Sequence, residues 1–182
     1  MVKSKSAYSV PTKDGRLATH IIVVWVDNEA GVLARVVGLF SGRGYNIESL
    51  AVAEVDFKEN ISRITIVTTG TPQVIDQIKL QLKKLVPVHK VADFKREDKN
   101  VIFKEMALFK IVSSEKNIQK TINACKNFNP VILDKSKKSA VIQITALRRE
   151  IDLMMKKLKP FGLVSASRTG AVAMTRGADI FN

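Results

Sequence analysis

A short turn at residues 27–31 combines groups that suit both ends of a free amino acid. The sequence Asp27-Asn28-Glu29-Ala30-Gly31 separates a β-branched run from an apolar-periodic segment, so it should join a strand to a helix. The first N–H groups of a helix lack partners within it and attract anions such as a carboxylate. Gly31 lets a ligand approach the backbone, and the side-chain oxygen of Asn28 can accept a hydrogen bond from an ammonium group. With Val32 and Leu33 as an apolar lining, the turn suits an aliphatic α-amino acid.

The same turn also fits an ordinary start of a helix. In that interpretation Asp27 or Asn28 caps the first turn, and Gly31 serves only the chain reversal. The spacing of residues 27–31 by itself favours this simpler interpretation over a ligand site.

Catalytic and metal-binding motifs are missing from the sequence. There is no G-x-S-x-G elbow, no P-loop and no H-E-x-x-H pair. The Gly42-Arg43-Gly44 stretch follows a predicted helix, and Ile47 stands where a dinucleotide-binding fingerprint requires glycine. The single cysteine, Cys125, falls on the apolar stripe of a predicted helix, which is typical of a buried, inert thiol. We therefore predict no catalytic residues and no metal site.

Apolar periodicity predicts the same order of elements twice. A continuous apolar run at 19–26 indicates a buried strand, and a helix should extend from Val32 to the glycines at 42 and 44. Strands are expected at 46–55, 61–69 and 88–94, with a second helix between Pro72 and Pro87. The remainder should form strands and helices at 104–112, 115–127, 131–135, 140–145, 147–158 and 164–169, the last strand continuing through 172–175.

This order, βαββαβ, is that of a ferredoxin-like module. The predicted fold class is α+β, with two such modules in succession. We expect a disordered basic tail at 1–18, a first domain at 19–94, a polar linker at 95–103 and a second domain at 104–178.

The net charge of +13 is concentrated in the second half of the chain. Residues 19–94 hold eight basic and eight acidic residues, whereas 95–182 hold eighteen basic and eight acidic ones. The basic runs are short and are not interleaved with aromatic residues, which disfavours a single-strand nucleic-acid surface. A solvated lysine-rich face, or a docking surface for an acidic protein, explains the charge better.

Longer motifs resemble one known family. The segment 27–36 resembles the first loop and helix of ACT domains. The continuation Gly38-Leu39-Phe40-Ser41-Gly42-Arg43-Gly44-Tyr45-Asn46-Ile47-Glu48-Ser49-Leu50 resembles the regulatory (small) subunit of acetolactate synthase, also called acetohydroxyacid synthase. Segments 62–66, 105–108, 168–170 and 176–177 also fit that family. Asn129, Pro130 and Ala146 depart from its usual pattern in the second domain.

The resemblance implies a function as well as a fold. It implies an N-terminal ACT domain, a homodimer formed through ACT domains, and a protein that is no enzyme by itself. Such a subunit binds and activates a thiamine-diphosphate-dependent catalytic subunit and confers feedback inhibition by valine or another branched-chain amino acid. Thiamine diphosphate, Mg²⁺ and FAD would belong to that catalytic subunit. The implied effector site has Asn28, Gly31, Val32 and Leu33 on its loop side, and Asn46 and Ile47 on the facing side.

Two other functions stay open at this level. One is a different ACT-type amino-acid sensor, and the other is a basic RNA-binding ferredoxin-like module, for which aromatic residues on the central strands would be required. Neither a nucleic acid nor a membrane is the expected partner. One cysteine fits a reducing compartment such as the cytoplasm, or a plastid stroma if the N-terminal extension is a targeting remnant or the gene is organellar.

Overall fold

The chain folds into two compact units in the computed structural model, which describes residues 15–178 except residue 97. The first unit contains the described residues up to Ile102, together with those from Ala173 onward. The second unit contains Phe103–Val172. The sequence prediction for residues 1–14 lies outside the described part of the chain.

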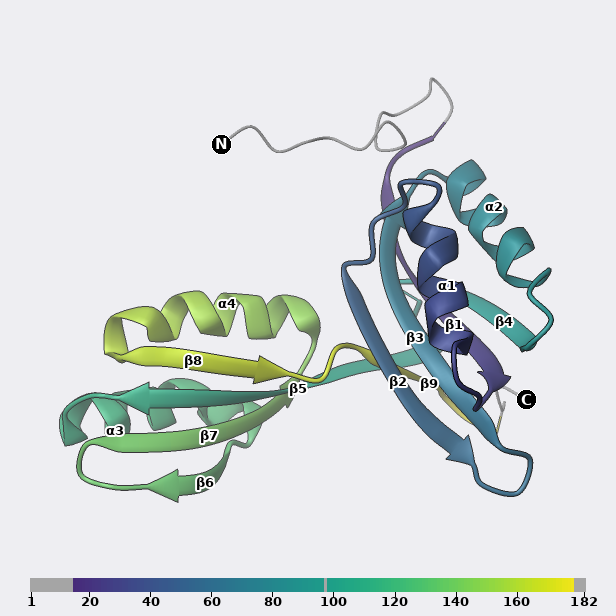
Figure 1. Ribbon diagram of the computed structural model, residues 1–182. Coiled ribbons are helices and arrows are strands. Elements are labelled where there is room, and N and C mark those ends of the chain that lie inside the picture. Colours follow the sequence, from purple (N-terminus) through teal and green to yellow (C-terminus); the bar gives the residue numbers. More distant parts are fainter. Residues whose placement is uncertain (1–14, 97, 179–182) are drawn as a thin grey trace. The chain divides into compact units, whose positions relative to one another are not determined.

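The first unit has the predicted βαββαβ order (Figure 1). Its elements are β1 (Ala18–Asp27), α1 (Val32–Ser41), β2 (Ser49–Asp56), β3 (Ile61–Gly70), α2 (Pro72–Leu82) and β4 (Val88–Lys95). The four strands form an antiparallel sheet in the order β2-β3-β1-β4, and both helices cover the same face. This arrangement leaves β2 and β4 as outer strands.

Alternate residues of the central strands build the first core. Ile22, Val24 and Val26 of β1 are at most 1% exposed and pack with the apolar stripes of both helices. The stripes include Val36 and Phe40 of α1, and Ile75, Ile78 and Leu82 of α2. Thr71 caps α2 by accepting a hydrogen bond from the N–H of Val74.

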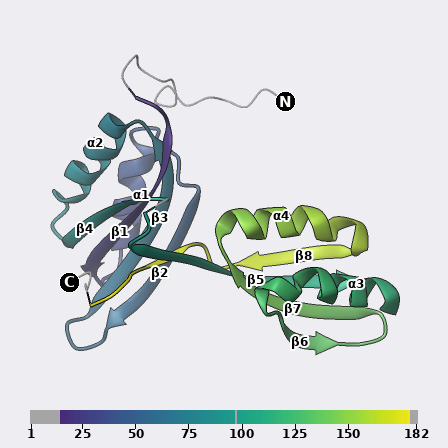
Figure 2. The ribbon, with the colours of Figure 1, turned by 180° about the vertical axis from the view of Figure 1, so that it is seen from behind.

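The helix-free face of this sheet is covered by a strand from the end of the chain. β9 (Val172–Thr175) pairs with β5 (Val101–Val112), which starts in the first unit. Figure 2 shows the end of the chain, in yellow, running along the face of the sheet that carries no helices. Arg63 on β3 donates a hydrogen bond to the carbonyl of Ala173, and its guanidinium lies 5.2 Å from the ring centroid of Trp25. Residues 173–178 therefore belong with the first unit.

The strands and compact units have bounds that differ in two places from the predicted linker and second domain. The polar linker expected at 95–103 is shorter, because β4 extends to Lys95 and β5 begins at Val101, whose apolar side chain is 6% exposed. The second unit ends at Val172 rather than at residue 178, because Ala173 is buried and its carbonyl is bound by Arg63.

The second unit repeats the order of the first. Its elements are β5, α3 (Glu115–Cys125), a 3₁₀ turn (Lys126–Phe128), β6 (Val131–Lys135), β7 (Ser139–Ala146), α4 (Arg148–Leu158), a second 3₁₀ turn (Lys159–Phe161) and β8 (Leu163–Arg168). The strands are ordered β6-β7-β5-β8. Phe109, Ile111, Ile142 and Ile144 pack against α3 and α4. Cys125 is buried in this core, and burial raises the pKa of its thiol to about 11, so the prediction of a buried thiol is confirmed.

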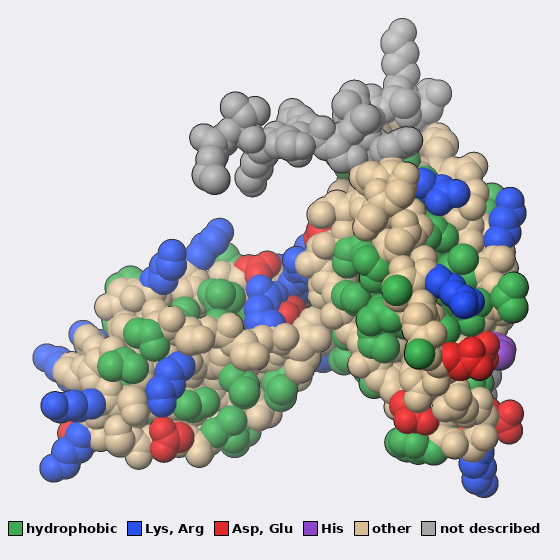
Figure 3. Space-filling view, in the orientation of Figure 1, with side chains coloured by type: hydrophobic (Ala, Val, Ile, Leu, Met, Phe, Trp, Pro, Cys, Tyr) green, Lys and Arg blue, Asp and Glu red, His purple; other side chains and the backbone are tan. Residues whose placement is uncertain are grey.

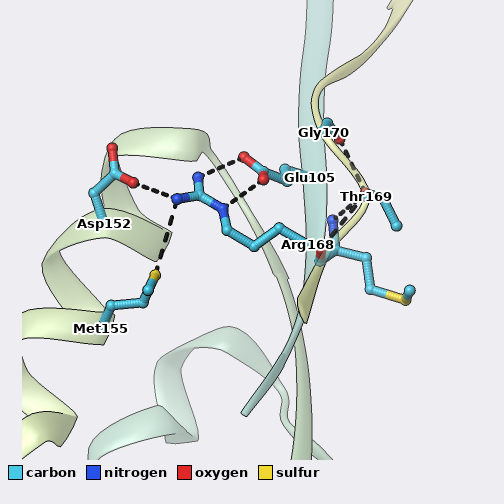
Figure 4. A network of polar contacts seen from close by, with 7 residues as sticks. Glu105, Asp152, Met155, Arg168, Thr169 and Gly170 are labelled. Carbon is cyan, nitrogen blue, oxygen red and sulfur yellow. Dashed lines mark hydrogen bonds and ion pairs between the residues drawn. The ribbon is translucent and has the colours of Figure 1, made fainter. Parts of the chain in front are cut away.

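A partly buried network of three charged side chains joins β5, β8 and α4 of the second unit (Figure 4). Arg168 donates to both oxygens of Glu105, at 2.6 and 2.8 Å, and to Oδ1 of Asp152 at 2.6 Å. The Glu105 side chain is only 3% exposed. Both carboxylates raise the pKa of Arg168, Glu105 more strongly through its hydrogen bonds. This network attaches α4 to the sheet.

A second polar cluster lies beneath α2 and should make stability depend on pH. Burial by itself would raise the pKa of Asp93, but a 2.7 Å hydrogen bond to His20 and the charges of His20 and Lys79 bring it below its ordinary value. A lowered pKa in the folded state stabilises the protein above the unfolded-state pKa, and this contribution is lost as pH falls through the folded value.

We therefore expect Asp93→Asn to lower the free energy of unfolding by about 1.5–3 kcal/mol at pH 7, because hydrogen bonds to charged groups contribute about this much. The difference in stability between wild type and variant should begin to narrow near pH 4, the ordinary pKa at which the carboxylate is protonated in the unfolded chain, and should close as pH falls through the lower pKa of the folded state. Urea unfolding between pH 3 and 7 measures both effects. Asp76→Asn is the matched control, since Asp76 also pairs with Lys79 but is 65% exposed. If the difference in the free energy of unfolding between wild type and Asp93→Asn does not change with pH, Asp93 does not have a lowered pKa in the folded state.

Candidate amino-acid-binding site

Gly31 forms the turn that precedes α1. It is the N-cap residue and has a left-handed backbone (φ 86°, ψ −10°), which glycine adopts without strain. No side chain caps the helix, and the first helical hydrogen bond runs from the N–H of Arg35 to the carbonyl of Gly31 at 3.0 Å. A Cβ atom at Gly31 would meet nothing within 4 Å. The helix therefore begins at an open, exposed backbone surface.

Asn28 is attached to the start of β3 rather than to the helix. Its Oδ1 accepts a hydrogen bond from Oγ of Ser62 at 2.9 Å, and its N–H donates to the carbonyl of Asn60 at 2.7 Å. Asp27 instead contacts His89 at 2.6 Å. The predicted N-cap role of Asp27 or Asn28 is thus wrong, because both side chains have other partners. An amide oxygen has two lone pairs, so Asn28 can still accept from a ligand.

The two apolar residues after Gly31 point in different directions. Val32 packs in the core and is 3% exposed, whereas Leu33 is 40% exposed. Leu33 is therefore the one that presents apolar surface beside the Gly31 turn.

Asn46 and Ile47 lie at the opposite end of α1. The helix has ten residues, about 15 Å, between the Gly31 turn and the segment that leads to Asn46. Along β3, Ser62 bonds to Asn28, while Oγ1 of Thr68 donates to the carbonyl of Asn46 at 2.7 Å. Six residues of strand separate these two contacts by about 20 Å. One chain therefore does not bring the loop side and the facing side of the implied site together.

Asn46 also differs from its predicted secondary structure. The sequence predicts that Asn46 begins a strand, but β2 starts at Ser49, and Asn46 belongs to the connection after α1. Gly44, with φ 69°, turns the chain there. Asn46 is exposed, and Ile47 packs partly against the core.

Sequence reasoning missed Ser62 and Asn60, which hold the Asn28 loop in place. No local motif marks them, because they reach Asn28 only through the pairing of Asp27 with Ile61 across β1 and β3. Within residues 15–178, with 97 omitted, no group of three or more His, Cys, Asp or Glu side chains could hold a metal ion. In the same described part of the chain, no helix is long and apolar enough to cross a membrane.

Comparison with known families assigns a class to each unit. Residues 22–90 match the family described as the AHAS small subunit-like ACT domain, and residues 104–177 match the family described as the small subunit of acetolactate synthase. The first unit, with its glycine turn before α1, is thus an ACT domain of this particular type.

Relatives match over most of the chain. An acetolactate synthase small subunit from Aquifex aeolicus is 38% identical over 92% of this chain and 86% of its own length. One from Mycobacterium bovis is 36% identical over 87% of this chain and 93% of its own length. The crystal structure of the acetolactate synthase small subunit from Thermotoga maritima superimposes with a TM-score of 0.80 and 33% identity, covering 88% of this chain and 99% of that one. The chain belongs to the family of acetolactate synthase small subunits.

Proposed function

We propose that this chain is a regulatory subunit that binds the thiamine-diphosphate-dependent catalytic subunit of acetolactate synthase and raises its activity. We further propose that it makes the complex sensitive to feedback inhibition by valine or another branched-chain amino acid. The observation that carries the effector proposal is the Gly31 turn, where an uncapped helix N-terminus, the Asn28 amide and exposed Leu33 lie together. These groups match a carboxylate, an ammonium group and an aliphatic side chain.

A second copy of the chain supplies the missing half of this site in the proposal. β2 is an outer strand of the first sheet and carries exposed apolar residues, with Val52 44%, Val55 49% and the adjacent Phe57 82% exposed. Two β2 strands that pair antiparallel about a twofold axis would continue the sheet across the dimer. Because that pairing reverses one chain relative to the other, the Gly31 turn of one protomer would face Asn46 and Ile47 of its partner.

Such a composite site gives the effector a physical means of regulation. A ligand held by both protomers binds their paired arrangement better than the separate chains, so it shifts the population toward that arrangement. The shift is limited by the difference in affinity between the two states. In the proposal, the paired state with effector bound is the one that lowers the activity of the catalytic subunit.

The test is an assay of acetolactate formation with the catalytic subunit of the same organism. Thiamine diphosphate, Mg²⁺ and FAD are supplied for the catalytic subunit, which is where the proposal places them. We expect no activity from this chain alone, a higher turnover when the two are mixed, and a decrease when valine is added. Activity from the isolated chain, or a mixture no faster than the catalytic subunit alone, would refute the proposal. Leucine and isoleucine, assayed in parallel, identify the effector.

A further inference from the structure

The outer strand β6 of the second unit exposes three consecutive large apolar residues. Val131 is 50% exposed, Ile132 43% and Leu133 52%, and the other two residues of the strand are exposed as well. Figure 3 shows hydrophobic side chains along this edge of the unit, with lysines beyond its outer end. Single exposed apolar residues are ordinary on protein surfaces, but a consecutive run on an edge strand favours association. These exposed residues are therefore typical of a surface that binds another molecule.

The backbone of β6 supports the same conclusion. Among residues 15–178, with 97 omitted, β6 pairs with β7 alone, so its other edge carries backbone groups that face away from the sheet. A bulge between Ile132 and Asp134 twists the strand, which protects an edge in part. No charged residue interrupts the run from Val131 to Leu133, so that protection does not extend to its side chains.

The charge around β6 indicates what kind of partner fits. Lys135, Lys137 and Lys138 are exposed beside the apolar run. The turn that carries the last two is ordered, because Oγ of Ser136 accepts hydrogen bonds from the N–H groups of Lys138 and Ser139. The only carboxylate in β6, Asp134, lies 3.8 Å from Nζ of Lys110. The lysines are therefore held next to the apolar run, where they can contact an acidic partner.

The same charge argues against a second copy as the occupant. The second unit holds fourteen basic and five acidic residues, a net charge of +9. Two such units repel each other because they carry like charges. An acidic surface is attracted to the second unit, and its association rate is higher. Residues 131–138 include no aromatic side chain on which a base could stack. A single-stranded nucleic acid is therefore a less suitable partner for this edge.

We propose that the β6 surface, defined as Val131, Ile132, Leu133, Lys135, Lys137 and Lys138, docks an acidic surface with an apolar centre on the catalytic subunit. This inference rests on the proposed function, because it takes the catalytic subunit as the partner. Side chains alternate between the two faces of a strand, and Ile132 pairs with the core residue Ile142, so Ile132 lies on the helix side of this edge. Val131 and Leu133 lie on the other face and form the buried apolar centre of the contact, and the lysines form its charged rim.

The experiment measures affinity for the catalytic subunit with full-length variants. Val131→Ser/Leu133→Ser removes the apolar centre, and we expect its Kd to rise about tenfold or more. Lys137→Glu/Lys138→Glu reverses the rim, and its loss of affinity should be largest at low salt and shrink above about 0.15 M ionic strength. Lys156→Glu/Lys157→Glu is the matched control, because it makes the same change of charge on the exposed face of α4. Its Kd should change less than about twofold, and all variants should retain the wild-type circular dichroism.

The results that would overturn the inference differ from one another, so each shows which part of it is wrong. If the wild-type chain binds the catalytic subunit and the β6 variants bind equally well, β6 is not the docking surface, but the proposed function stands. If the α4 control loses as much affinity as the lysine variant, overall charge rather than this surface is responsible. If the Ser variant turns a wild-type dimer into a monomer, the β6 surface binds a second copy of the chain. If it abolishes binding to a labelled oligonucleotide, the β6 surface binds a nucleic acid. Failure of the wild-type chain to bind the catalytic subunit would overturn the proposed function as well.

Discussion

Gly31→Asp is expected to leave activation of the catalytic subunit intact while abolishing inhibition by valine. The new carboxylate would stand at the open N-terminus of α1, where the effector carboxylate is proposed to bind. Two like charges about 4 Å apart cost on the order of 1–4 kcal/mol between a water-like and a surface-like dielectric. Effector binding should therefore weaken by roughly five- to a thousandfold. Calorimetry with valine and an inhibition curve of the mixed complex measure the two consequences.

The structure explains why the variant should still fold, and it supplies a control. No atom lies within 4 Å of a Cβ at Gly31, so the strain comes only from the positive φ of 86°. A non-glycine residue there costs about 1–2 kcal/mol, and aspartate is favourable in the first turn of a helix. Gly31→Ala carries the same backbone strain without the charge, so its effector affinity should fall much less. Equal losses in both variants would mean that backbone conformation, not charge, controls the site.

Asn46→Ala tests the facing side of the same site, and we expect it to weaken effector binding by about 1–3 kcal/mol through lost hydrogen bonds. Because Asn46 and Gly31 lie at opposite ends of α1, the two variants can complement each other in a dimer. A heterodimer of Gly31→Asp and Asn46→Ala has one doubly altered site and one intact site. After subunit exchange at equal amounts, about a quarter of the sites should therefore recover. No recovery despite confirmed exchange would place each site within one chain.

Arg168→Ala is expected to destabilise the second unit by about 3–5 kcal/mol, since it leaves the carboxylate of Glu105 buried without its cation. Arg168→Lys should also be destabilising, because a lysine cannot reproduce the two parallel hydrogen bonds to Glu105. The single tryptophan, Trp25, lies in the first unit and so reports its unfolding separately. Urea unfolding followed by circular dichroism should show an earlier transition, while the Trp25 fluorescence transition stays near its wild-type position.

A double variant isolates the ionic part of this effect. Combining Arg168→Met with Glu105→Gln removes the buried charge of Glu105 together with its cation, so it should cost less than Arg168→Met alone. If the two substitutions are simply additive, the pair contributes no coupling energy and the large effect of Arg168→Ala comes from lost packing. A coincident shift of fluorescence and circular dichroism would instead show that the two units unfold as one.

Local sequence patterns were sufficient for most of the secondary structure. Apolar runs and helical stripes predicted both βαββαβ repeats, and turn residues such as Thr71-Pro72 lie where predicted, because period and capping depend on near neighbours. The sequence also assigns Gly31 to the turn before the first helix, and the structure adds that its backbone there is left-handed. The family itself is readable from motifs in residues 27–50.

Tertiary structure alone decided the features that depend on distant residues. The return of residues 173–178 to the first unit depends on Arg63, which is 110 positions away from Ala173. The attachment of Asn28 to Ser62, rather than to its helix, follows from the register of β1 against β3. The separation of Gly31 from Asn46 within one chain follows from the length of α1, because the two residues lie at opposite ends of that helix. Hydrophobic period carries no information about such pairings, because many registers bury the same apolar faces and only long-range hydrogen bonds and packing choose among them.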